Sequence, residues 1–319
     1  MLKIQSAGLL LIVAGSVLSA QPAQFNGPLS GFLFDPPSRT VRPILGVPGA
    51  ARLGPAVLTE MDFASVAPDG GTVIGLSGGQ AVLVHPAPNS VFQPAVLENA
   101  LAGIDRAVWA ADSSAVVIAS SARRQVQRIS LSDPRAAGDP IELPGEISTL
   151  AANSDATLIV AGVRSETDGG LYLLSAGTPP IRILPMTDPA SAGFAGDHVL
   201  YVADRATGEI FCLRSLSAAP EVTRLFSSAD GITEPVGIAV TSKPSRISIA
   251  DKSRQVLRVY DLSSHQLLSE TALDAPPAFL SPLTASVYQL TARASLQDLL
   301  LVYDGRTAAV YFVPTEEEE

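Results

Sequence analysis

The chain has 319 residues, of which 47% are hydrophobic and only 16% are charged, with 25 glycines and 25 prolines. Its formal net charge is −10, which argues against nucleic acid as a partner because no phosphate-neutralising surface is evident. The single cysteine excludes a disulfide framework, and we expect Cys212, in an apolar stretch, to be a small buried hydrophobe.

The first twenty residues have the pattern of a secretory signal peptide. Lys3 supplies the positive start, residues 7–18 form an apolar stretch, and Ser19-Ala20 is a small-residue cleavage site. The apolar stretch is short for a membrane span and contains two glycines. We therefore expect residues 1–20 to be cleaved, leaving a secreted or periplasmic protein without a membrane span. The alternative is an uncleaved membrane anchor.

A clear hairpin follows in residues 31–44. Gly31–Asp35 and Thr40–Ile44 are short apolar strands joined by a Pro-Pro-Ser turn. No further strands that would precede them are evident, so the place of this hairpin depends on the pattern that follows it.

From residue 61 onward the chain repeats a unit of short strands. Four versions of one strand end in alanines at positions 119, 161, 203 and 250, which are 42, 42 and 47 residues apart. A period in the forties built from short strands is typical of β-propeller blades. The six clearest units begin near Met61, Arg106, Ile147, Ala192, Pro235 and Pro277.

One unit illustrates the expected blade, with strands named a to d in chain order. In the unit that starts at Arg106, strand a is Ala107–Ala111, strand b is Ala115–Ala119, strand c is Gln125–Ile129 and strand d is Pro140–Leu143. Turn-forming residues separate the strands. Apolar runs without strict alternation indicate strands buried on both faces, as expected for sheets packed between neighbouring sheets.

The sequence therefore predicts an all-β fold, a β-propeller of six to seven four-stranded antiparallel blades. Residues 21–314 would form this single domain, and residues 315–319 an acidic tail. The ring must close, because an open end would leave an unpaired edge and an exposed apolar face. Either the first hairpin and residues 50–58 form a reduced seventh blade, or the hairpin decorates the seam between six blades. We favour seven blades.

Three segments resemble repeats of known propellers. The segment from Pro235 to Tyr260 resembles an NHL repeat, Leu200–Asp204 resembles a YVTN-type strand, and Val66–Gly70 resembles a turn of TolB-type and WD40-like propellers. The resemblance implies membership of the NHL/YVTN-type, WD40-like β-propeller superfamily. Such propellers are mostly binding scaffolds, with a minority of enzymes, and a shared fold does not transfer activity.

Catalytic signals are weak. Gly75–Gly79 matches the G-x-S-x-G pattern around Ser77, but a strand follows where a hydrolase needs a helix. The three histidines, His85, His198 and His265, lack metal-ligand spacing. A calcium-dependent lactonase of the six-bladed propeller type would need oxygen ligands converging in the channel, and few are available. We predict no catalytic residues, no metal ligands and no cofactor.

The connections of the blades carry the more informative pattern. In a propeller the b–c and d–a connections share one face, and the expected b–c connections contain a cluster of cations: Arg123, Arg124, Arg164, Arg205, Lys252, Arg254 and Arg293. One interpretation is a face that captures anionic groups through guanidinium hydrogen bonds. The other, which we favour, is that acids of the d–a connections neutralise these cations in exposed ion pairs.

Taken together, the sequence favours a secreted or periplasmic binding or protein-interaction scaffold. Its partner would be a protein or an extracellular polymer bound at the b–c/d–a face. The alternative is a metal-dependent hydrolase or lactonase of the six-bladed propeller type.

Overall fold

The structure is a computed structural model that describes residues 28–85, 93–132, 137–216, 219–242 and 245–315. The expected signal peptide and the Glu316–Glu319 part of the expected acidic tail lie outside the described residues. The secondary structure of the described part comprises strands and one 3-10 helix, η1 (Ser228–Asp230).

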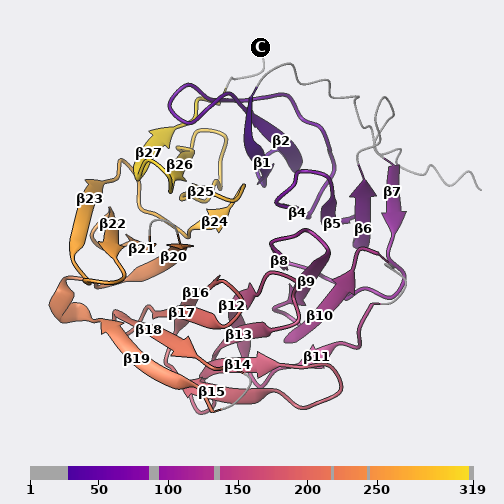
Figure 1. Cartoon of the computed structure of the whole chain (residues 1–319). Helices are drawn as coiled ribbons and strands as arrows, with labels where there is room; N and C mark the ends of the chain where they lie inside the picture. The colour runs from indigo at the N-terminus through magenta and orange to yellow at the C-terminus, as the bar shows by residue number, and fades with distance from the viewer. Residues whose placement is uncertain (1–27, 86–92, 133–136, 217–218, 243–244, 316–319) are drawn as a thin grey trace, which may run out of the picture.

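Seven antiparallel sheets stand around a common axis (Figure 1). We number them blades 1 to 7 in chain order. Blade 1 comprises β1 (Leu29–Asp35), β2 (Thr40–Leu45) and β3 (Arg52–Leu53). Blade 2 comprises β4 (Phe63–Val66), β5 (Val73–Ser77), β6 (Gln80–His85) and β7 (Gln93–Val96), and blade 3 comprises β8 (Arg106–Trp109), β9 (Ala115–Ser120), β10 (Gln125–Ser130) and β11 (Ile141–Glu142).

The other four blades each have four strands in the described residues. Blade 4 comprises β12 (Glu146–Ala152), β13 (Ile159–Arg164), β14 (Gly170–Leu174) and β15 (Ile181–Pro185), and blade 5 comprises β16 (Pro189–Ala195), β17 (Val199–Asp204), β18 (Glu209–Arg214) and β19 (Glu221–Phe226). Blade 6 comprises β20 (Pro235–Ser242), β21 (Ser245–Asp251), β22 (Val256–Asp261) and β23 (Leu267–Ala272), and blade 7 comprises β24 (Ser281–Pro282), β25 (Val287–Gln289), β26 (Leu301–Asp304) and β27 (Ala309–Phe312).

This arrangement confirms the predicted all-β propeller and the count of seven blades. In blades 2 to 7 the first strand lies near the axis and the last at the rim (Figure 1). The hairpin at residues 31–44 belongs to blade 1, where β3 pairs with β2 through Ile44 and Leu53. Blade 1 thus has three strands in the described residues. The first strand of blade 7, β24, has only two residues.

The apolar residues collect between the blades and not in one central core. The described residues form seven buried clusters, each shared by two neighbouring blades. Every residue of β9, for example, is buried, because that strand packs against a neighbouring sheet on each side. Each blade therefore depends on both neighbours to exclude water from its faces.

The ring closes between blades 7 and 1. Their shared cluster includes Leu33 and Ile44 from blade 1 and Val302 from blade 7. The Leu53 amide donates to the carbonyl of Pro314 at 3.0 Å. A fully buried ion pair also crosses this seam, with 2.6 Å between Arg293 Nη1 and Asp35 Oδ1. Apolar packing, one backbone bond and one buried ion pair thus join the first and last blades.

Candidate functional site

One face of the ring carries the connections between the second and third strands of the blades together with the connections from one blade to the next. Backbone bonds join the two kinds of connection: Arg205 N donates to Asp188 O at 2.9 Å, and Lys252 N donates to Glu234 O at 2.9 Å. We call this surface the loop face. It corresponds to the b–c/d–a face expected from the sequence.

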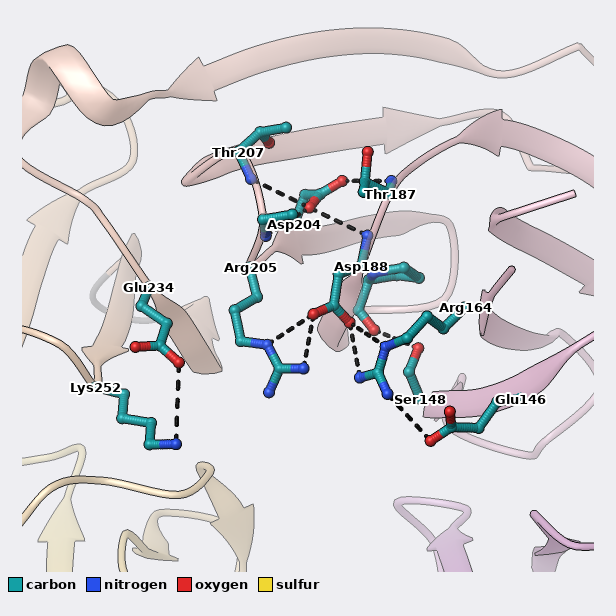
Figure 2. Close-up of polar contacts among 12 residues, drawn as sticks. Glu146, Ser148, Arg164, Thr187, Asp188, Asp204, Arg205, Thr207, Glu234 and Lys252 are labelled. Carbon is teal, nitrogen blue, oxygen red and sulfur yellow. Dashed lines mark hydrogen bonds and ion pairs between the residues drawn. The ribbon is translucent and has the colours of Figure 1, made fainter. Parts of the chain in front are cut away.

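Aspartates at the ends of second strands fix these connections. Asp204 ends β17, and its carboxylate accepts hydrogen bonds from the amides of Thr187 at 2.8 Å and Ala206 at 2.9 Å (Figure 2 shows the Thr187 bond). Asp251 ends β21, and its carboxylate accepts hydrogen bonds from the amides of Thr233 at 2.7 Å and Arg254 at 3.2 Å. One carboxylate thereby holds two loops in a fixed relation.

The electrostatics of Asp251 reflect this role. Burial by itself raises its pKa, but the hydrogen bonds from Thr233, Arg254 and Ser253 outweigh that effect and lower the pKa below its ordinary value. The carboxylate is therefore ionised at neutral pH, and the folded state favours the charged form.

Asp188 lies between two of the predicted cations (Figure 2). Arg164 reaches its Oδ1 through Nε at 3.0 Å and Nη2 at 2.9 Å, and Arg205 reaches its Oδ2 through Nε at 2.7 Å. Arg164 also bonds Glu146 at 3.1 Å. The hydrogen bond to Asp188 is the main reason that the pKa of Arg164 is raised above its ordinary value. These two guanidinium groups are thus already partnered within the chain.

Two further predicted cations also have internal partners. Lys252 Nζ lies 3.9 Å from Glu234 Oε1 in a largely exposed pair (Figure 2). Arg293 corrects the expectation of a cation presented on this face. Its side chain is only 1% exposed, because it pairs with the buried Asp35 of blade 1 at the seam. Arg293 therefore offers no charge to a partner.

The remaining three predicted cations have no partner in the described part of the chain. Arg123, Arg124 and Arg254 are exposed, and within the described part of the chain their side chains form no hydrogen bond or ion pair. Arg123 and Arg124 are adjacent in the turn between β9 and β10, so this turn presents two guanidinium groups to solvent.

Arg124 has an unusual backbone conformation for its residue type. Its φ is 54°, in the left-handed region that favours glycine. The corresponding residue of blade 5 is Gly208 with φ 70°, where a Cβ would lie 2.5 Å from the carbonyl oxygen of Ile232. An L-residue in this region costs on the order of 1 kcal/mol. At position 124 the chain therefore keeps an arginine where glycine would be less strained.

One cation of the loop face was not among the predicted ones. Arg39, in the turn between β1 and β2, bonds Asp62, which precedes β4. The turn after Asp35 has the same form as the turns after Asp204 and Asp251. This shared aspartate is the signal that would have placed Arg39 on the loop face.

The catalytic candidates find little support in the geometry. Ser77 ends β5 and is followed by the hairpin to β6, as expected, and its hydroxyl donates to Glu60 O at 3.1 Å. His85 contacts the hydroxyl of Thr72 at 3.2 Å, and His265 packs edge-on against Phe226. Among the described residues, no three His, Cys, Asp or Glu side chains are grouped so that they could hold a metal ion. The seven blades also differ from the six of the lactonase class.

No described helix is both long and apolar enough to cross a membrane. No family model matches the chain, and no curated protein matches it.

Solved structures do match. A crystal structure of a functionally unknown protein from Desulfotomaculum acetoxidans DSM 771 aligns with a TM-score of 0.61 and 14% identity, covering 90% of this chain and 99% of that chain. A chain of a nidogen/laminin complex aligns with a TM-score of 0.54 and 12% identity, covering 76% and 93%.

A third match is Sqt1 of Chaetomium thermophilum, bound to the N-terminus of the ribosomal protein L10. Its TM-score is 0.57 at 13% identity, covering 86% of this chain and 80% of that chain. At such identities the likeness speaks for the fold alone. By its own strand order and by these neighbours, the chain is a seven-bladed β-propeller.

Proposed function

We propose that this chain is a secreted or periplasmic binding scaffold whose loop face engages a protein or an extracellular polymer. Two structural neighbours come from structures of protein complexes, one of nidogen with laminin and one of Sqt1 with the N-terminus of L10. The pattern of residues 1–20 supports export. No catalytic role is part of the proposal.

The observation that carries the proposal is the pair of free guanidinium groups on blade 3. Arg123 and Arg124 are exposed and have no partner among the described residues, while Arg164 and Arg205 are held by Asp188. The left-handed backbone of Arg124 recurs at Arg39 and Gln255 in the corresponding turns, so it is a property of the turn. The exposed charge is what favours a binding role, because a guanidinium binds carboxylates or sulfates through paired hydrogen bonds.

A matched set of variants tests this role. Arg123→Ala combined with Arg124→Gly removes both charges, and glycine at position 124 suits the backbone, so the fold should be as stable as in the original chain. We expect immobilised original protein to capture a partner from the extracytoplasmic fraction of its source cells, as identified by mass spectrometry. The double variant should lose most of that capture.

The control is Arg306→Ala, an exposed cation in the turn between β26 and β27 on the opposite face. It should capture as well as the original chain. Equal capture by the double variant and the original would refute the role of blade 3. The same preparation tests the proposed export. The N-terminal residue of the recovered protein should be Gln21, and a protein that still begins at Met1 would contradict export.

A further inference from the structure

The connection from β25 to β26 in blade 7 is the longest of its kind on the described loop face. It spans residues 290–300, whereas residues 121–124, 205–208 and 252–255 make the corresponding turns in blades 3, 5 and 6. Short turns suffice to join such strands. The extra length in blade 7 therefore builds something other than a connection.

This connection is held in one shape by its own polar groups. Thr291 Oγ1 donates to Leu299 O at 2.7 Å and accepts from Leu301 N at 2.9 Å. The Asp298 carboxylate accepts from the amides of Ala294 at 2.7 Å and Ser295 at 2.8 Å. At its base, Arg293 is tied to Asp35. The surface that it presents is thus formed before any partner arrives, which lowers the entropic cost of binding.

The presented surface includes two exposed leucines among polar residues. Leu296 is 57% exposed and Leu299 is 38% exposed. The other exposed large hydrophobic residues of the described chain lie on outer strands or at the opposite end of the ring. Beside Leu299 is a recess of about 350 Å³, walled by Ala275, Pro276 and Ala292 together with Gln297 and Asp298. A recess of this size accepts one or two large side chains.

The charges around the recess select the kind of partner. Asp298 lines it, and the hydrogen bonds from Ser295 and Ala294 lower the pKa of Asp298 below its ordinary value, so it stays charged. Asp274 is exposed and immediately precedes Ala275. The adjoining turn, whose Gln255 carbonyl accepts a hydrogen bond from the amide of Leu273, carries one free cation, Arg254, against these two aspartates. The local excess is negative, as is the net charge of −10, and both attract a basic partner.

We propose that Ala275, Pro276, Ala292, Leu296 and Leu299 form a docking patch for a partner polypeptide that presents a large apolar side chain next to a lysine or arginine. The inference rests on the proposed binding function and names the chemistry of the partner. A second copy of this chain is disfavoured as the occupant, because it would bring an acidic surface against another. An exposed leucine on a rigid loop, next to a recess, is the arrangement expected of an interface anchor.

Selection from a phage-displayed library of random 12-residue peptides tests the patch directly. We expect the selected peptides to combine Leu, Phe or Trp with neighbouring Lys or Arg. The tightest peptide is then synthesised with a fluorescent label and titrated by anisotropy. Leu296→Ser should weaken its binding at least tenfold, which corresponds to about 1.4 kcal/mol. Asp274→Asn should weaken binding about threefold and reduce its dependence on salt.

The matched control is Leu268→Ser on β23, where the leucine is 49% exposed at the rim of the ring. It should bind the peptide as the original chain does. Selection of acidic peptides, failure to select any peptide, or equal binding by the Leu296 variant would each overturn the inference. If binding is lost instead in the Arg123/Arg124 double variant, the proposed function stands and the docking patch alone is refuted.

Discussion

At the scale of single residues, the ion pair between Asp35 and Arg293 differs from the other pairs of this molecule. Both side chains are almost fully buried, at 0% and 1% exposure. The Nε atom of Arg293 has no partner among the described residues. A buried pair of this kind gives little net stability over an apolar pair, but removing one partner leaves an isolated charge in an apolar site.

Asp35→Ala should therefore lower the free energy of unfolding by about 3–5 kcal/mol. Combining Asp35→Leu with Arg293→Met should recover most of that loss, because no charge is then left unpaired. Urea unfolding at neutral pH measures both. Glu234→Ala, which breaks the exposed pair with Lys252, is the comparison and should cost less than about 1 kcal/mol. An equal, small effect of Asp35→Ala and Glu234→Ala would contradict this account.

The burial of Arg293 shows a limit of sequence reading. Its position between two strand patterns placed it correctly in a loop-face connection. The pattern gave no sign that the side chain turns inward, because its partner Asp35 is far away in sequence and belongs to the first blade. Exposure of a loop residue depends on contacts between blades, and such contacts leave no local periodicity.

At the scale of elements, the repeated alanine explains why the strands could be found. Ala119, Ala161, Ala203 and Ala250 are all 0% exposed and lie in second strands packed between blades. A small residue there suits the close approach of two sheets. In β1 the corresponding residue before the aspartate is Phe34, which is partly exposed. The hairpin of blade 1 therefore lacked the feature that blades 3 to 6 share.

The aspartates that end second strands lead to a test at this scale. The pKa of Asp251 is lowered in the folded state, so its contribution to stability is present above the unfolded pKa of about 4 and is lost as the pH falls through the folded pKa. Asp251→Asn should lower the free energy of unfolding at pH 7. The gap between variant and original should narrow as the pH falls below about 4.

Urea unfolding at several pH values between 7 and 3 measures this gap. Asp274→Asn serves as the control, because Asp274 is exposed and makes no hydrogen bond within the described residues. It should change stability by no more than about 0.5 kcal/mol. A gap for the Asp251 variant that stays constant over the whole pH range would show that the carboxylate does not act through its charge.

Outer strands show how the elements avoid pairing with other molecules. β15, β19 and β23 each contain a register shift against their inner neighbour. Prolines interrupt β7 at Pro94 and end β15 at Pro185. Bulges and prolines make an edge unsuitable for adding a further strand. The exposed aliphatic residues of β15, β19 and β23 therefore do not mark an edge for strand addition.

At the scale of the whole molecule, the seven shared clusters make the ring interdependent. Removing residues 29–58 would delete blade 1 and expose the apolar surfaces of blades 2 and 7 that it covers. We expect this variant to aggregate or to form large assemblies in size-exclusion chromatography, whereas the intact chain elutes as a compact species. A deleted chain that elutes as a compact monomer and unfolds cooperatively would contradict the interdependence.

The overall architecture was the most predictable level, and the contacts between repeats the least. The alternation of short strands and turns predicted each blade, since strand pairing within a blade is local in sequence. Which loop cations are neutralised depends on residues such as Asp188, which lies between blades 4 and 5 and pairs with Arg164 and Arg205. The sequence favoured ion pairs between the loop cations and the acids of the connections, and the structure shows which residues form them.

The position of Asp188 gives the loop face a selectivity of its own. An incoming carboxylate that sought Arg164 or Arg205 would have to displace one that the protein already supplies, tethered and correctly oriented. Because Asp188 is part of the same chain, its effective concentration is high, and a carboxylate from another molecule competes poorly for these two guanidinium groups. Four of the seven predicted cations therefore have an internal partner, and we expect anions to bind at the other three, Arg123, Arg124 and Arg254.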